Sequence, residues 1–142
     1  NEISNGDGRN NFRGNLTLNI KPIQGMNIRL RASVEKANKN GWKFDNYYTM
    51  WDIDGQYETF REASNNYNYE GVISYNRNIK KVSLSANLGT SMQKNDWYKL
   101  WNQVSQLAAP DVKSLSNNAS ILSGTESVIA KEKQSVFGML SL

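Results

Sequence analysis

The chain has 142 residues, with 17 basic and 13 acidic residues, a formal net charge of +4 and a mean hydropathy of −0.68. Because it contains no cysteine and no histidine, disulfides, the common zinc ligand sets and histidine-based catalytic triads are excluded. No apolar run approaches the roughly 18 residues of a membrane-spanning helix, which excludes a helical membrane protein but not one built of strands. The positive charge is mild and scattered, so it gives no indication of nucleic-acid binding.

The first part of the chain alternates strictly between apolar and polar residues. This period of two extends over residues 11–21 and again over residues 26–35, and it predicts two strands with one apolar and one polar face. Pro22 and Gly25 lie between the two segments and supply a tight bend. The sequence therefore predicts a β-hairpin.

A second hairpin of the same design follows later in the chain. Its strands are expected near residues 67–76 and 82–92, and a fifth strand is expected near residues 133–142. In the fifth strand Phe137 and Met139 blur the alternation, so the face that each residue occupies stays open at this point.

The connections between these strands alternate between short and long. Long loops are expected near residues 36–66 and 93–132, and this layout is typical of an outer-membrane barrel with short periplasmic turns and long extracellular loops. Strands of about 10 residues also match the 9–11 residues of a tilted membrane strand. Tyr67 and Tyr75 lie on the apolar face at a separation that suits the two aromatic girdles of a barrel.

We therefore predict an all-β fold, an antiparallel meander that forms a sector of a large transmembrane β-barrel. Five strands do not close such a barrel, so we expect residues 1–142 to be one partial barrel domain whose two ends are cut from a longer protein. Alternation alone also fits a soluble β-sandwich, in which the apolar face packs against a second sheet.

Five segments resemble the barrel of SusC-like TonB-dependent transporters. They are NLTLNIKPIQGMNIRLRAS (15–33), NYEGVISYN (68–76), LSANLG (84–89), SLSN (114–117) and KEKQSVFG (131–138). The resemblance implies an outer-membrane barrel of about 22 strands with an N-terminal plug. It also implies import of glycans or oligopeptides, driven through TonB, beneath a SusD-like surface lipoprotein.

The resemblance defines the expected partners and location. These are a SusD-like lipoprotein, the TonB complex acting through a plug that this chain lacks, an oligosaccharide or peptide substrate, and outer-membrane lipid. It implies no enzyme activity and no cofactor. Two alternatives are a soluble all-β carbohydrate-binding module and a structural barrel sector of an adhesin or secretion protein.

Candidate binding residues are aromatic and lie in the predicted long loops. Aromatic side chains stack on sugars or peptide side chains at little entropic cost, but they equally form the core of a long loop. The candidates for substrate or lid contact are Trp42, Tyr47, Tyr48, Trp51, Trp97, Tyr98 and Trp101.

Charged residues on the polar face give a second set of candidates. Arg13, Arg29 and Arg31 are predicted to give the barrel lumen a local positive charge, unless they pair with Glu35 or with carboxylates of the plug. No catalytic residue and no metal site is predicted, although an irregular calcium site built from Asp52, Asp54 and Glu58 stays open.

Overall fold

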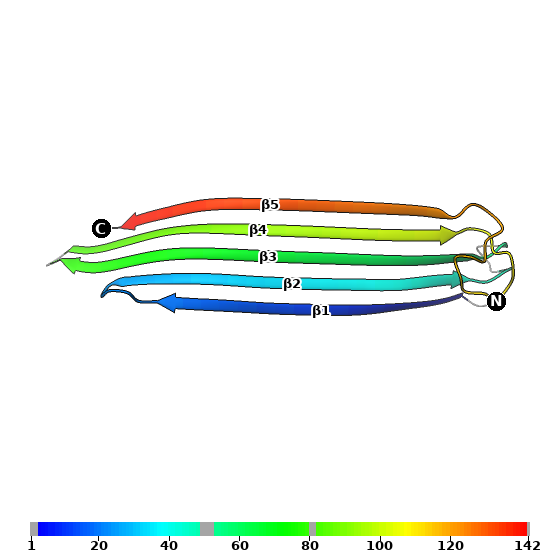
Figure 1. Cartoon of the computed structure of the whole chain (residues 1–142), viewed down its shortest axis with the longest axis horizontal. Helices are drawn as coiled ribbons and strands as arrows, with labels where there is room; N and C mark the ends of the chain where they lie inside the picture. The colour runs from blue at the N-terminus through cyan, green and yellow to red at the C-terminus, as the bar shows by residue number, and fades with distance from the viewer. Residues whose placement is uncertain (1–2, 49–52, 80–81, 142) are drawn as a thin grey trace. The chain divides into compact units, whose positions relative to one another are not determined.

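A computed structural model describes residues 3–48, 53–79 and 82–141, and it contains five β-strands in one sheet. The strands lie in chain order, and Figure 1 shows each beside the next. Their bounds are β1 (Ile3–Ile20), β2 (Met26–Asp45), β3 (Gln56–Ile79), β4 (Val82–Val104) and β5 (Ser123–Ser141). This arrangement confirms the predicted all-β antiparallel meander in an open sheet. Within the described ranges, no helix has the length and apolar character needed to cross a membrane.

The strands are longer than the sequence predicted. β2 runs to Asp45 rather than to residue 35, and β3 begins at Gln56 rather than at residue 67. β4 likewise continues to Val104, β5 starts at Ser123, and β1 starts at Ile3. The predicted long loops at 36–66 and 93–132 are therefore wrong in extent, because most of their residues are paired in the sheet.

Gly25 forms the turn between β1 and β2. Its φ of 86° lies in the left-handed region, and a Cβ at this position would lie 2.3 Å from the carbonyl oxygen of Asn76. The Gly25 carbonyl in turn accepts a hydrogen bond of 2.8 Å from the Asn76 backbone N–H. The predicted turn at this position is thus formed, and it requires glycine.

The chain divides into two compact units, each containing a part of every strand. The loop-end unit comprises residues Asn1–Asn11, Ala37–Ser64 and Trp97–Ile129. The turn-end unit comprises Phe12–Lys36, Asn65–Asp96 and Ala130–Leu142.

A small hydrophobic core lies in the loop-end unit. Phe44, Val104 and Leu107 are buried, and four further residues pack against them: Trp42, Tyr47, Tyr57 and Leu115. Two of these core residues come from residues 105–122, the connection between β4 and β5, which we call the strap. Asn117 is buried in the strap, where its side-chain amide donates to the carbonyls of Ala109 (2.8 Å) and Val112 (2.9 Å).

In the turn-end unit the apolar face is exposed. Leu16, Leu18 and Leu30 have exposed fractions of 71%, 51% and 46%. A Cβ at Gly71 in β3 would lie 3.5 Å from Leu30 in β2 and 3.8 Å from Thr90 in β4, so these three residues lie on the same face of the sheet. Every second residue along each of these strands shares that face. Within the described part of the chain there is one sheet, and these leucines lie on its open face rather than in a sandwich core.

The structure also gives the two faces of β5. A Cβ at Gly138 would lie 3.7 Å from Leu88, which is on the apolar face. Phe137 points to the other face, where its ring lies against Gly89, because a Cβ there would be 2.2 Å from that ring. Val136 and Leu140 therefore share the apolar face with Leu88, and Phe137 lies among the polar residues.

Candidate functional site

The polar face of the loop-end unit carries two tryptophans on one strand. Trp97 and Trp101 are four residues apart in β4, so both lie on the same face. Trp97 lines a hollow of about 180 Å³ together with Arg9, Lys39 and Glu62. Trp101 lines a second hollow of about 350 Å³, and Lys99 lines it as well.

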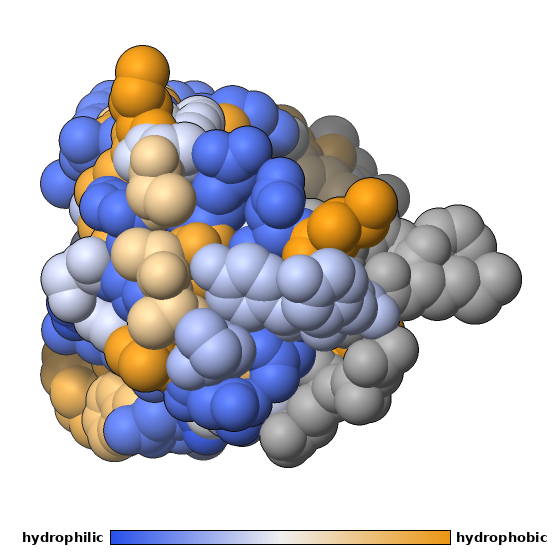
Figure 2. Space-filling model, turned by 90° about the vertical axis from the view of Figure 1, so that its right-hand side faces the viewer, coloured by the Kyte–Doolittle hydropathy of each residue, from blue (hydrophilic) through white to orange (hydrophobic). Residues whose placement is uncertain are grey.

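An ion pair lies between the two tryptophan hollows. The Lys99 ammonium is 3.3 Å from a carboxylate oxygen of Glu62 on β3. Exposed ion pairs of this kind contribute little stability, but they hold the two long side chains in place. The face thus presents aromatic surfaces flanked by charges of both signs. Figure 2 looks onto the loop-end unit from the side of the loops between the strands; hydrophilic side chains prevail there, and apolar residues form separate patches.

Phe60 lies across a glycine on the same face. A Cβ at Gly41 would be 2.5 Å from the Phe60 ring and 2.8 Å from the backbone oxygen of Gly6, so only glycine fits. The Lys39 ammonium lies 5.1 Å from the centroid of the Phe60 ring, within cation–π range.

A hydrogen-bonded network links β2, β3 and β4 at the end of the polar face. Asp45 is buried and accepts hydrogen bonds from Lys43, at 2.8 Å, and from Gln56. Gln103 donates to Gln56 at 2.8 Å and to Glu58 at 3.3 Å. Burial alone would raise the pKa of the Asp45 carboxyl, but the hydrogen bonds from Lys43 and Gln56, with the positive charge of Lys43, hold that pKa below its usual value.

Acid is expected to loosen this network. Because the pKa of Asp45 is lowered by folding, its stabilising effect is complete above the unfolded-chain pKa of about 3.9 and is lost as the pH falls through the lower folded-state value. Hydrogen-exchange pulse labelling of β2 and β3 at successive pH values would measure the loss. Asp45→Asn should remove this part of the acid dependence, and an unchanged acid profile in that variant would contradict the assignment.

Two of the predicted contact residues are packed in the loop-end core. Trp42 and Tyr47 contact the buried cluster, and the Tyr47 hydroxyl donates to the Leu107 carbonyl. The ring of Trp42 also covers Gly6, and the ammonium of Lys113 lies 5.0 Å from the centroid of that ring. For these two aromatics the structure shows the packing role that the sequence left open.

The remaining predicted aromatics are not brought together. Tyr98 lies on the opposite face of β4 from its neighbour Trp97. Tyr48 is 72% exposed and has a φ of 55°. Trp51 lies outside the described residues. Substrate or lid contact by the seven aromatics stays a prediction.

The three predicted arginines lie in the turn-end unit. Arg13 forms an ion pair with Glu35 at 2.6 Å. Pairing with Glu35 was the alternative to a free positive charge in the lumen. Arg29 lies 3.5 Å from Glu70, and Arg31 is exposed. Of the three residues that left a calcium site open, Asp52 lies outside the described residues. Among those that are described, no group of three potential ligands is placed to hold a metal ion.

Sequence alternation gives no sign of the Asp45 network or of the role of Asn117. Both depend on contacts between distant parts of the chain, such as the bond from Gln103 to Gln56. The sequence holds one weak signal of a longer strand: Trp42 and Phe44 have the same parity as the apolar residues of 26–35, although Lys36, Asn38 and Asn40 interrupt the pattern.

No protein-family model matches the sequence, and no curated protein sequence matches it. Solved structures do match the fold. The chain is similar to the RagAB peptide transporter, with a TM-score of 0.79 and 16% identity over 96% of this chain and 16% of that one. The RagAB peptide importer in the "closed-closed" state gives a TM-score of 0.76 at 16% identity, again over 96% of this chain and 16% of that chain. The "open-open" state gives 0.68 at 15% identity, over 98% of this chain and 15% of that chain. The chain spans about a sixth of the length of these transporter chains and has the fold of the corresponding part.

Proposed function

We propose that the chain is a wall sector of an outer-membrane, TonB-dependent importer of the SusC-like type. In this proposal the apolar face of the turn-end unit meets lipid, and the opposite polar face lines the passage for substrate. The loop-end unit, which contains the other part of each strand, lies outside the lipid in this proposal. The chain contributes no catalytic step, because the process is passage rather than bond making or breaking.

The exposed apolar face is the observation that carries this proposal. Leu16, Leu18 and Leu30 lie on one face of a single sheet, and hydrocarbon is the medium that such a face requires. The similarity in fold to the RagAB peptide transporter supports the same assignment. It also favours oligopeptides over glycans as the substrate class, and a SusD-like surface lipoprotein as the partner.

The polar face supplies the proposed substrate contacts. Trp97 and Trp101 offer ring surfaces, and Arg9 and Lys99 beside them suit the charged groups of an oligopeptide. Arg31 adds positive charge to the same face in the turn-end unit. None of these contacts requires a cofactor.

Uptake measurements test this function. Cells that carry the full-length parent protein as their sole importer of this type should accumulate a labelled oligopeptide mixture, and deletion of the gene should abolish the uptake. Trp97→Ala combined with Trp101→Ala should weaken capture by about tenfold, since each stacking surface contributes roughly 0.5–1.5 kcal/mol.

A matched control lies between the two tryptophans on the opposite face of β4. Leu100→Ala removes a large side chain from the same strand and should leave uptake unchanged. The outer-membrane level of each variant would be measured in parallel. Unchanged uptake after deletion, with the parent correctly assembled in wild-type cells, would contradict the importer role and favour a structural barrel sector.

A further inference from the structure

Two adjoining hollows lie on the apolar face of the turn-end unit. One has a volume of about 540 Å³ and the other of about 450 Å³, and both are lined by Leu16, Ala32 and Tyr69. We call the two hollows together the apolar groove. Gly14 lines the first and Gly71 the second, so at these two positions the apolar face has no side chain.

The groove is open space rather than a packing defect. A Cβ at Gly14 would meet Phe12 and Val34 only at 3.5 Å, and one at Gly71 would meet Leu30 at 3.5 Å, which are ordinary contact distances. A methyl group would therefore fit at both positions. Because glycine has no side chain, the surface is hollowed there between larger apolar residues.

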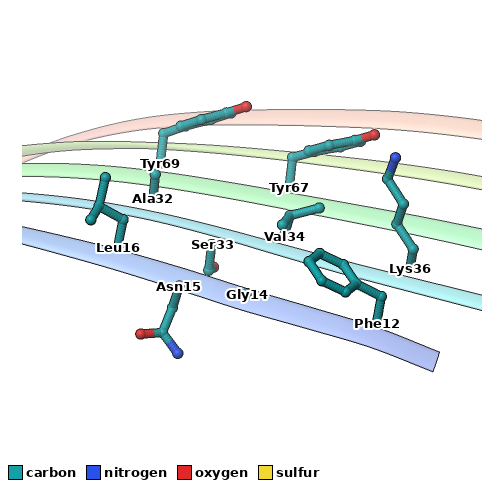
Figure 3. A pocket seen from close by; sticks show the side chains of 10 residues that line it. All are labelled: Phe12, Gly14, Asn15, Leu16, Ala32, Ser33, Val34, Lys36, Tyr67 and Tyr69. Carbon is teal, nitrogen blue, oxygen red and sulfur yellow. The ribbon is translucent and has the colours of Figure 1, made fainter.

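A positive charge lies at one end of the groove. Lys36 lines the first hollow and is exposed, and among the described residues it has no ion-pair partner. Figure 3 shows that the rings of Tyr67 and Tyr69 lean along the sheet toward the Lys36 end, with their hydroxyls at the tips. The groove is thus lined mainly by apolar residues and ends at the Lys36 ammonium, with the Tyr67 hydroxyl on that side and the Tyr69 hydroxyl farther back.

We propose that the apolar groove seats one acyl chain of a phosphate-bearing outer-leaflet lipid, and that Lys36 binds the phosphate. The inference rests on the proposed function, which places this face in the membrane. A lysine at the boundary of an apolar surface attracts anionic headgroups, and tyrosine side chains favour the same interfacial zone. The Tyr67 hydroxyl, which points toward the Lys36 end, is a group that donates a hydrogen bond to a phosphate oxygen.

Charge argues against a second copy of the chain as the occupant. A symmetric contact through this face would cover two exposed Lys36 ammonium groups, one from each copy, with no acid paired to either in the described residues. A phosphate-bearing lipid supplies both the hydrocarbon and the compensating negative charge.

Native mass spectrometry of the full-length parent protein in detergent tests the proposal. The probes are diphosphoryl lipid A and the same lipid after removal of its phosphates. The parent is expected to retain the phosphorylated probe about fivefold more tightly, which is the usual contribution of one lysine near an anionic headgroup. Lys36→Met should remove this preference and leave binding of the dephosphorylated probe unchanged.

Filling the groove should affect both probes alike. Ala32→Leu places a larger apolar side chain where both hollows meet, so retention of both forms should fall. Ala86→Leu is the matched control, because Ala86 shares the apolar face but lines neither hollow. Equal retention by wild type, Lys36→Met and Ala32→Leu would overturn the lipid site, and so would a lipid-free dimer held together through this face.

Failure of the inference and failure of the proposed function are distinguishable. If the parent leaves the membrane fraction in alkaline salt without detergent, the proposed function fails and the lipid site fails with it. If the parent needs detergent but shows no preference for the phosphorylated probe, only the lipid site is overturned.

Discussion

Replacing Leu18 with arginine is expected to prevent assembly of the parent protein in the outer membrane. Leu18 is 51% exposed on the apolar face, so the proposed function places its side chain in hydrocarbon. An arginine at such a position costs about 2–4 kcal/mol near the middle of the bilayer. Heat-modifiability on gels and the level of protein in outer-membrane fractions would measure the loss.

The neighbouring residue provides the control for this prediction. Thr17 lies at the same depth in β1 but on the polar face, so Thr17→Arg should assemble at close to the wild-type level. If both variants assembled equally well, hydrocarbon would not cover the apolar face. If both failed equally, the two faces would not differ in environment, and the barrel assignment would be wrong.

Phe44→Ala is expected to release the strap from the sheet. Phe44 is completely buried in the loop-end core with Val104 and Leu107, and truncation of a buried phenylalanine costs about 3–5 kcal/mol. Leu107 contributes the strap side of this core, so the loss should appear as faster amide exchange throughout residues 105–122. Hydrogen-exchange mass spectrometry of the full-length parent would measure it.

A substitution at an exposed position of the strap is the control, because it shortens a side chain without affecting the buried core. Val112 is 45% exposed, so Val112→Ala should change the strap's protection by no more than about 0.5 kcal/mol. Equal protection in Phe44→Ala and wild type would mean that the hydrogen bonds of the strap, such as those of Asn117, hold it without the core.

The sequence was sufficient to predict the hairpins of the turn-end unit but not the ends of the strands. Leu18 and Leu30 alternate with polar residues because each face there meets a different environment. In the second half of β4 this contrast disappears, since Trp97 and Lys99 lie on one face while Tyr98 and Leu100 lie on the other. The strands stay paired in that region through backbone hydrogen bonds. These bonds do not depend on the polarity of the side chains, so the polarity pattern does not predict them.

From the sequence, the candidate site was predictable only as a set of aromatic residues, without their positions in space. Aromatic residues in residues 36–66 and 93–132 indicated a surface for stacking, and both Trp42 and Trp97 belong to that set. Only the fold separates them, because Trp42 packs on a glycine and a core while Trp97 lines a hollow on the polar face. The network around Asp45 required the pairing of three strands and had no local signal.

Glycine–aromatic pairs recur between adjacent strands. Phe60 covers Gly41, Phe137 covers Gly89 and Trp42 covers Gly6. If β3 slid past β2, or β5 past β4, by two residues, the ring of Phe60 or Phe137 would meet a lysine, asparagine or serine where it now lies against a glycine. These two strand pairs therefore favour one alignment, and a mechanical force directed along the strands has to displace the two rings before the strands can slide.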